Sequence, residues 1–216
     1  MCYYKHRKGG CLEMKKIISM GLILVCIIGM TACGKVKTEK EIDTLADAKS
    51  DLYESAEELE EAASVVVKVI RTDKSENVVK TLATGTDMPY GYTKSMVKVT
   101  EIMKNTSGQS IEIAEEIQIL ENQYTYIEDG TKVTCHVNNY KMMEPGNEYI
   151  LYLEYSESDD WFVILSGLLG KVPVSEEEVL FPSSRITFYK NQPKEDDSYT
   201  RNIMEKIRKE SLERYE

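Results

Sequence analysis

From Ser64 to Leu165 the sequence alternates between apolar and polar residues, and this pattern limits the fold more than any other feature. Val and Ile crowd the run Ser64–Arg71, and Val97 and Val99 mark a second run, Thr93–Met103. Successive side chains of a strand point to opposite faces, so a period of two predicts strands with one buried face. We therefore expect a mainly β (α+β) protein with about seven short strands.

Turn residues separate the later strands. Three turns are evident: Asp129-Gly130 joins Tyr124–Glu128 to Thr131–Val137, Pro145-Gly146 precedes Glu148–Tyr155, and Ser156–Asp160 leads into Trp161–Leu165. Gly adopts the positive φ that a tight hairpin requires, and Pro presets the φ of a turn. Short strands joined in this way favour a single antiparallel β-barrel or sandwich over residues 64–190, and an OB-like barrel is the best guess.

Helical periodicity flanks the β region on both sides. Apolar residues recur at steps of three and four over residues 42–63, which predicts an N-terminal helical segment. Ser55 and Glu58 have the spacing of a capping box, so a fresh helix can start at Ser55. Residues 198–216 have an apolar side and mixed charge elsewhere, which predicts a C-terminal amphipathic helix. Residues 191–197 are the expected linker into it.

The first part of the chain is organised like a secretory signal. Lys15 and Lys16 precede an apolar run of 14 residues, 17–30, and Thr31-Ala32-Cys33 follows. The run suits the apolar region of a signal peptide and is shorter than the roughly 20 residues of a membrane-spanning helix. A permanent transmembrane helix is the alternative interpretation.

The end of this signal resembles the lipobox of bacterial lipoproteins. Met30-Thr31-Ala32-Cys33 follows the pattern of an aliphatic residue, a small residue, Gly or Ala, and then Cys, with Met30 where Leu is usual. The resemblance implies a signal peptide over residues 14–32, cleavage between Ala32 and Cys33, and a diacylglyceryl group on the Cys33 sulfur. Two acyl chains, such as palmitate, anchor a domain stably. Residues 33–41 are then a lipidated tether, whereas a structural Cys33 behind an ordinary signal is the alternative.

Residues 1–13 do not resemble a leader. Lys8-Gly9-Gly10 can be encoded by AAA-GGA-GG, which resembles a ribosome-binding sequence. We therefore predict that translation starts at Met14 and that residues 1–13 are untranslated in the cell.

Charge argues against one class of partner. The net charge is -10, and residues 1–32 contribute +4 from five Lys and Arg against Glu13, so the exported part is near -14. Nucleic acids are bound by Lys and Arg that replace the counterions of phosphate. We expect no nucleic-acid partner, and we expect membrane attachment through the diacylglyceryl group at Cys33 rather than through a basic face.

Cysteine and histidine give no catalytic or metal-binding signature. Of five cysteines, Cys33 and Cys135 remain after the predicted cleavage, and His136 is the one histidine beyond the leader. That set is too small for a metal site. Cys135 and His136 could act as a nucleophile and a base, but neighbours on a strand point to opposite faces, so a buried, inert Cys135 is favoured. We predict no catalytic residue, cofactor or metal ligand.

Aromatic residues of the predicted sheet are the better candidates for function. They are Tyr124, Tyr126, Tyr140, Tyr149, Tyr152, Tyr155 and Trp161. Aromatic side chains bury area at little cost in rotamer freedom, which suits a peptide, glycan or protein partner, whereas cross-strand packing is the structural alternative. Of the 37 Asp and Glu residues, all but Glu13 lie beyond the leader, so a carboxylate pair for glycoside hydrolysis also stays open.

The block from Ser55 to Lys171 resembles a loose group of uncharacterised bacterial lipoproteins with small β-barrel domains. The shared features are a helix end at Ala56–Ala63, a Val-rich strand at Val65–Ile70 and the turn Gly146-Asn147-Glu148-Tyr149, and they imply architecture alone. We predict a lipid-anchored binding or interaction module at the cell envelope, on the outer face of the cytoplasmic membrane, with an unknown protein, peptide or glycan partner. The alternatives are an envelope hydrolase using acidic residues and a structural or assembly subunit of an envelope complex.

Overall fold

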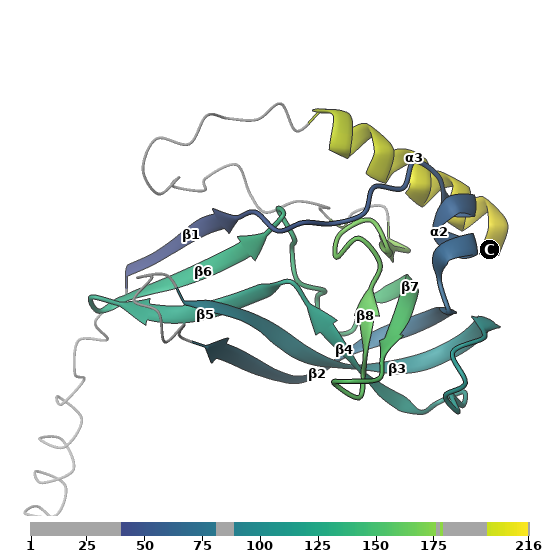
Figure 1. Cartoon of the computed structure of the whole chain (residues 1–216), viewed down its shortest axis with the longest axis horizontal. Coiled ribbons are helices and arrows are strands. Elements are labelled where there is room, and N and C mark those ends of the chain that lie inside the picture. The colour runs from purple at the N-terminus through teal and green to yellow at the C-terminus, as the bar shows by residue number, and fades with distance from the viewer. Residues whose placement is uncertain (1–39, 81–88, 176–177, 179–197, 216) are drawn as a thin grey trace, which may run out of the picture. The chain divides into compact units, whose positions relative to one another are not determined.

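The computed structural model describes residues 40–80, 89–175, 178 and 198–215, which are mainly β (Figure 1). The elements in chain order are β1 (Lys40–Ala46), α2 (Ala56–Ala62), β2 (Val65–Lys80), β3 (Tyr90–Asn105), β4 (Glu116–Glu121), β5 (Gln123–Glu128), β6 (Thr131–Val137), β7 (Glu148–Ser156), β8 (Trp161–Ile164), β9 (Lys171–Pro173) and α3 (Ser198–Tyr215). The predicted signal peptide, Ala32, Cys33 and the linker 191–197 lie outside the described residues.

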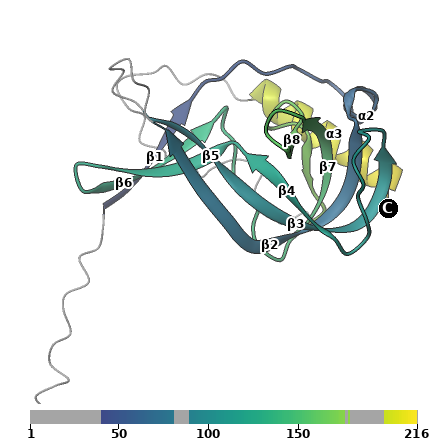
Figure 2. The same ribbon diagram turned by 60° about the horizontal axis from the view of Figure 1, so that its bottom comes forward.

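The described strands form two sheets. The smaller has the order β1-β6-β5, and the larger has the order β2-β3-β4-β8-β7-β9, in which β2 also pairs with β7. β2 and β3 are long and curved, and they run side by side from the small sheet toward the side where α2 lies (Figure 2). The β4–β8 pairing rests on Ile119 with Phe162 and Leu120 with Val163. The sheets do not form a closed barrel.

The expectation of a purely antiparallel barrel or sandwich is wrong at two places. β1 pairs with β6 in parallel, and β4 pairs with β8 in parallel. Both parallel pairs join strands that are distant in sequence, which hairpin signals cannot reveal. The described residues also contain nine strands rather than seven, since β1 and the short β9 carry no clear alternation.

The helical segment predicted over residues 42–63 is largely wrong. Lys40–Ala46 is a strand whose backbone pairs with β6 from Thr131 to Val137. The helical spacing of Ile42 and Leu45 is outweighed because the edge of β6 offers a row of backbone donors and acceptors. The helix is confined to Ala56–Ala62.

α2 begins where the capping box predicts. The Ser55 hydroxyl accepts a hydrogen bond from the N–H of Glu58 at 3.2 Å. The Glu58 carboxylate accepts from the N–H of Glu54 at 2.7 Å, one residue before the cap. This pair of bonds satisfies backbone donors that a helix start leaves free.

α2 and α3 cover the larger sheet. Leu59 of α2 and Ile207 of α3 are buried in one apolar cluster with Val65, Val67 and Leu153 of the sheet. The Tyr152 hydroxyl of β7 lies 2.8 Å from the Ser211 hydroxyl of α3. Burial of aliphatic side chains at about 25 cal/mol per Å² is the main force holding these layers together. The C-terminal helix is therefore confirmed over Ser198–Tyr215.

The β5–β6 hairpin is confirmed, with β6 at the expected limits and β5 beginning at Gln123, one residue before the expected start. Its turn residues Asp129 and Gly130 have φ values of 48° and 74°. Both are positive, as the tight turn favoured between twisted strands requires. The ring of Tyr124 in β5 packs on β3 at Gly91, where a Cβ atom would collide with that ring. The hairpin therefore lies directly against the β2–β3 pair.

Candidate binding face

The outer face of β3 carries aromatic and basic side chains at alternate positions. Tyr90 is exposed, and Tyr92 and Lys94 are half-buried, whereas the alternate residues Thr93 and Ser95 are buried. The strand period of two places Tyr90, Tyr92 and Lys94 together on the solvent side. Lys80 on β2 pairs with Tyr90 and shares this face.

Trp161 of β8 completes an aromatic–lysine strip, which we define as Lys80, Tyr92, Lys94 and Trp161. The ring centroids of Tyr92 and Trp161 are 5.5 Å apart, and the ring planes are inclined by 56°. The Lys94 ammonium lies 5.0 Å from the Trp161 centroid, and the Lys80 ammonium lies 5.5 Å from the Tyr92 centroid. These are cation–π distances, and at such exposed sites each is worth about 0.5–1 kcal/mol.

A tight turn fixes the start of β8. The Tyr155 hydroxyl donates to the Asp160 carboxylate at 2.5 Å, and this hydrogen bond is the main reason that the pKa of Tyr155 is raised. Tyr155 also contacts the ring of Phe162, with centroids 5.2 Å apart. Trp161 lies between Asp160 and Phe162 in the chain, and both of these neighbours contact Tyr155. The backbone position of Trp161 is therefore well defined.

A buried polar network lies on the inner side of the same strands. The Glu121 carboxylate at the end of β4 is fully buried and accepts from the Ser95 hydroxyl at 2.5 Å and from the Tyr140 hydroxyl at 2.8 Å. It also accepts from the Met143 N–H at 2.7 Å and pairs with the Arg71 Nε at 3.3 Å. A buried carboxylate is tolerated when its lone pairs are satisfied in this way.

Arg71 links the network to β2 at a point where the β2–β3 register shifts. Its guanidinium also donates to the carbonyls of Thr72 and Lys74, and its backbone pairs with Asn147 and Gly146. One side chain therefore ties together the β2 irregularity, the end of β4 and the turn before β7. Ser95 belongs to both β3 and the network, so the network holds the strand that presents Tyr92 and Lys94.

Lys171 of β9 adds a second buried cation. Its ammonium lies 4.3 Å from the Tyr140 ring centroid and donates to the Lys141 carbonyl. Burial lowers the pKa of Lys171 to about 8, opposed by Glu121 and Glu178. Burial also raises the pKa of Tyr140 well above its ordinary value, so its hydroxyl stays protonated and donates to Glu121.

The aromatic residues singled out from the sequence divide into two groups. Tyr140, Tyr149 and Tyr152 are fully buried, and Tyr124 is nearly so, which makes them core residues rather than a binding surface. Tyr126, Tyr155 and Trp161 keep part of their surface in solvent, and of these Trp161 lies in the aromatic–lysine strip. Cross-strand packing therefore explains most of the set.

Sequence reasoning missed Tyr92, Lys80 and Lys94. The predicted strand began at Thr93, which left Tyr92 outside it, and β2 was expected to end at Arg71 rather than at Lys80. The period-two spacing of Tyr90, Tyr92 and Lys94 was a usable signal. Nothing local indicates that Trp161 lies beside them.

Cys135 and His136 are both buried on β6, and different neighbours surround them. Burial raises the pKa of the Cys135 thiol, opposed by its hydrogen bond with Tyr124. The His136 ring bonds through Nδ1 to the Tyr140 carbonyl at 2.8 Å and through Nε2 to Asp43 at 3.2 Å. A raised thiol pKa disfavours the thiolate needed for nucleophilic attack.

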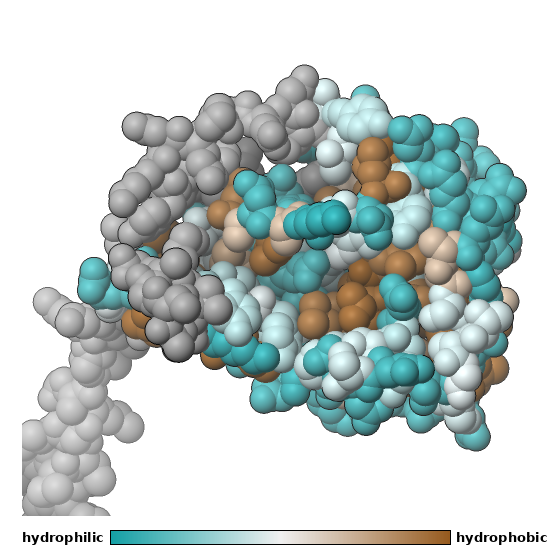
Figure 3. All heavy atoms as spheres, in the orientation of Figure 1, coloured by the Kyte–Doolittle hydropathy of each residue, from teal (hydrophilic) through white to brown (hydrophobic). Residues whose placement is uncertain are grey.

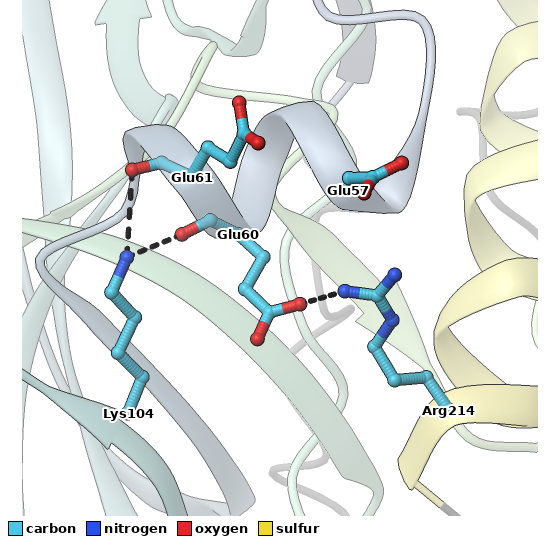
Figure 4. Close-up of a pocket in the computed structure, with 5 residues that line it drawn as sticks. All are labelled: Glu57, Glu60, Glu61, Lys104 and Arg214. Carbon is cyan, nitrogen blue, oxygen red and sulfur yellow. Dashed lines mark hydrogen bonds and ion pairs between the residues drawn. The ribbon is translucent and has the colours of Figure 1, made fainter.

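A polar hollow of about 250 Å³ lies where α2, α3 and β3 meet. Its lining side chains are Glu57, Glu60, Glu61, Lys104 and Arg214 (Figure 4). Lys104 donates to the carbonyls of Glu60 and Glu61 at 2.5 and 3.4 Å, and Arg214 pairs with the Glu60 carboxylate. Lysine at the C-terminal carbonyls suits the helix dipole. Lys104 and Arg214 therefore fasten α2 to the sheet and to α3.

Apolar surface on the described residues is of two kinds. On the face of Figure 3, hydrophobic residues gather over the region of β7 and β8 and are bordered by hydrophilic ones. The large apolar side chains exposed elsewhere, such as Leu52, Ile113 and Ile127, belong to different segments. Single exposed apolar residues are normal on soluble domains.

The described residues show neither a metal-binding cluster nor a membrane-spanning helix. Within them, no group of three or more His, Cys, Asp or Glu side chains is placed to hold a metal ion. Neither described helix combines the length and the apolar character needed to cross a membrane.

Comparison with known proteins adds no relative. No protein-family model matches the chain, and no curated protein or solved structure is significantly similar to it. The function must be argued from the residues themselves.

Proposed function

We propose that this chain is a lipid-anchored binding module of the cell envelope, held on the outer face of the cytoplasmic membrane by a diacylglyceryl group at Cys33. The ligand contacts the aromatic–lysine strip. The observation that supports this proposal most is the contact between Tyr92 and Trp161 on a sheet face, with ring centroids 5.5 Å apart. The ammonium groups of two lysines lie over these rings. Clustered, partly exposed aromatic rings with basic neighbours are typical of recognition surfaces.

The order of strand pairing supports an OB-like domain for this module. β2, β3, β4, β8 and β7 pair in sequence, and β7 pairs again with β2. OB folds are five-stranded, partly open Greek-key barrels, and their ligands bind over the second and third strands and the loops beside them. β3 is second in this order, and Trp161 follows the turn between β7 and β8. This fold-level analogy supports the position of the binding face and leaves its ligand open.

The anchor is tested by metabolic labelling of cells with an alkynyl fatty acid. We expect the wild-type chain and a Cys135→Ala variant to take up the label and Cys33→Ala to take up none, because the thioether forms only at the lipobox sulfur. Mass analysis of the mature N-terminus should find Cys33 as its first residue. Label retained in Cys33→Ala, or an unmodified Cys33 in the natural product, contradicts the anchor.

The binding face is tested by a photo-crosslinking amino acid placed in the full chain. At Lys80, on the strip, we expect an adduct in intact cells that is lost when Trp161→Ala is added. The control position is Lys209, which is exposed on α3. Adducts of equal yield at both positions, or adducts indifferent to Trp161→Ala, argue against the strip as the ligand face.

A further inference from the structure

We infer that the ligand of the aromatic–lysine strip is an uncharged sugar chain. This inference rests on the proposed function, since it names the substrate class of the same face. Four features carry it: the angle between the two rings, the presence of both charge signs around them, the pairing of both edges of β3 at Thr93 and Lys94, and the register of the two lysines.

The ring geometry suits successive sugar rings better than one flat group. The planes of Tyr92 and Trp161 are inclined by 56°. A planar group such as a base cannot stack on both faces at once, because stacking requires nearly parallel planes. The C–H faces of two linked sugars can each pack against one ring, since a glycosidic linkage lets neighbouring sugars tilt.

Charged groups of both signs surround the rings. Lys94 lies 3.7 Å from the Glu76 carboxylate, and Glu76 is 69% exposed. Lys80 and Lys94 supply hydrogen-bond donors, and Glu76 supplies an acceptor. A sugar hydroxyl both donates and accepts, so it can use either partner. An acidic chain is repelled by Glu76 and by the net charge of -10. A basic chain is repelled by the two lysines that lie over the rings.

Beneath Lys94 the backbone is paired on both sides, which leaves no free strand edge there for an extended peptide. Thr93 and Lys94 pair with Asn77 and Glu76 of β2 on one side and with Glu121 and Leu120 of β4 on the other. Peptides that bind sheets in the extended form add a strand at a free edge. A sugar chain needs only side chains, which this face presents.

The register places the two lysines on either side of Tyr92. Lys80 pairs with Tyr90 and Glu76 pairs with Lys94, so the polar groups stand at the two ends of the Tyr92 position. The Lys94 side chain is 26% exposed, and its cation–π contact is weak enough to be exchanged for a hydroxyl. A ligand can therefore displace the lysines without breaking a strong interaction.

The test uses Trp161, which is the single tryptophan of the chain, as the reporter. The full lipoprotein in detergent is titrated with three hexamers: glucose, N-acetylglucosamine and galacturonic acid. We expect at least one uncharged hexamer to change the Trp161 fluorescence saturably and to bind at least tenfold more tightly than the acidic hexamer. Tightest binding of galacturonic acid, or no binding of either uncharged hexamer at millimolar concentration, overturns the inference.

Variants locate the binding and separate the two proposals. Tyr92→Ala and the conservative Lys80→Gln should each lower the affinity for the sugar, the first at least fivefold. Tyr199→Ala and Lys209→Gln on α3 should leave that affinity unchanged. Lys80 is exposed, so its variant keeps the fold even if Tyr92→Ala does not. If no hexamer binds while the Lys80 cross-link persists, the sugar chain is wrong and the binding face stands. If both fail, the binding face falls as well.

Discussion

Glu121→Leu is expected to lower the free energy of unfolding by about 3–5 kcal/mol, because removing one partner of a buried ion pair leaves the other charge uncompensated. Glu121 accepts from Ser95, Tyr140 and Met143 and pairs with Arg71, and all four donors lose their acceptor together. Urea unfolding followed by circular dichroism measures the change.

Two variants show whether the loss comes from the buried network. Glu116→Leu changes the same residue type on the same strand, but its ion pair with Lys74 is partly exposed, at 34% and 62%, so about 0–1 kcal/mol is expected. Arg71→Met combined with Glu121→Leu should recover part of the stability, since the buried charge is then gone. Equal losses from Glu121→Leu and Glu116→Leu contradict the prediction.

The network also bears on the binding face. Ser95 lies between Lys94 and Met96 on β3 and donates inward to Glu121, so the strand that carries Tyr92 and Lys94 is fixed from below. Binding residues recognise a ligand well when the elements that present them are rigid. A variant that loosens the network is therefore expected to lower the affinity of the aromatic–lysine strip for its ligand as well as the stability of the fold.

Local signals predicted the elements that depend on neighbouring residues. The hairpin at Asp129-Gly130 and the cap at Ser55 were predicted at their observed positions. Turns and helix caps depend on residues that are close together in the sequence. The alternation Ile117, Ile119, Glu121 also places Glu121 on the inward face of β4. That placement signals a buried carboxylate, although a charged residue at the end of an apolar run is easily taken for the end of the strand.

Elements that depend on distant partners were not predictable from the sequence. β1 is a strand because it pairs with the edge of β6, 91 residues later along the chain. Trp161 meets Tyr92 because β8 pairs in parallel with β4, and this pairing has no hairpin signal. The strip therefore joins residues whose proximity is a property of topology rather than of any local motif.

Lys171→Met is expected to raise the free energy of unfolding at pH 7 by about 2 kcal/mol. Burial lowers the pKa of Lys171 to about 8 from 10.5, which corresponds to a cost of about 3 kcal/mol for keeping the charge in the folded state. Loss of its hydrogen bond to the Lys141 carbonyl offsets about 1 kcal/mol of the gain.

The pH dependence gives the sharper test. Between pH 8 and 10.5 the unfolded chain holds a proton at Lys171 that the folded protein has released, so wild-type stability gains from this group as pH rises through that range. The Met variant lacks the gain, and its advantage should therefore shrink from pH 8 upward. Tyrosines and Cys135 titrate in both proteins, so their contributions largely cancel in the difference. Lys209→Met, at an exposed lysine of α3, should show no such trend. An advantage that is absent at pH 7, or constant to pH 10.5, means that the folded protein does not hold Lys171 at a lowered pKa.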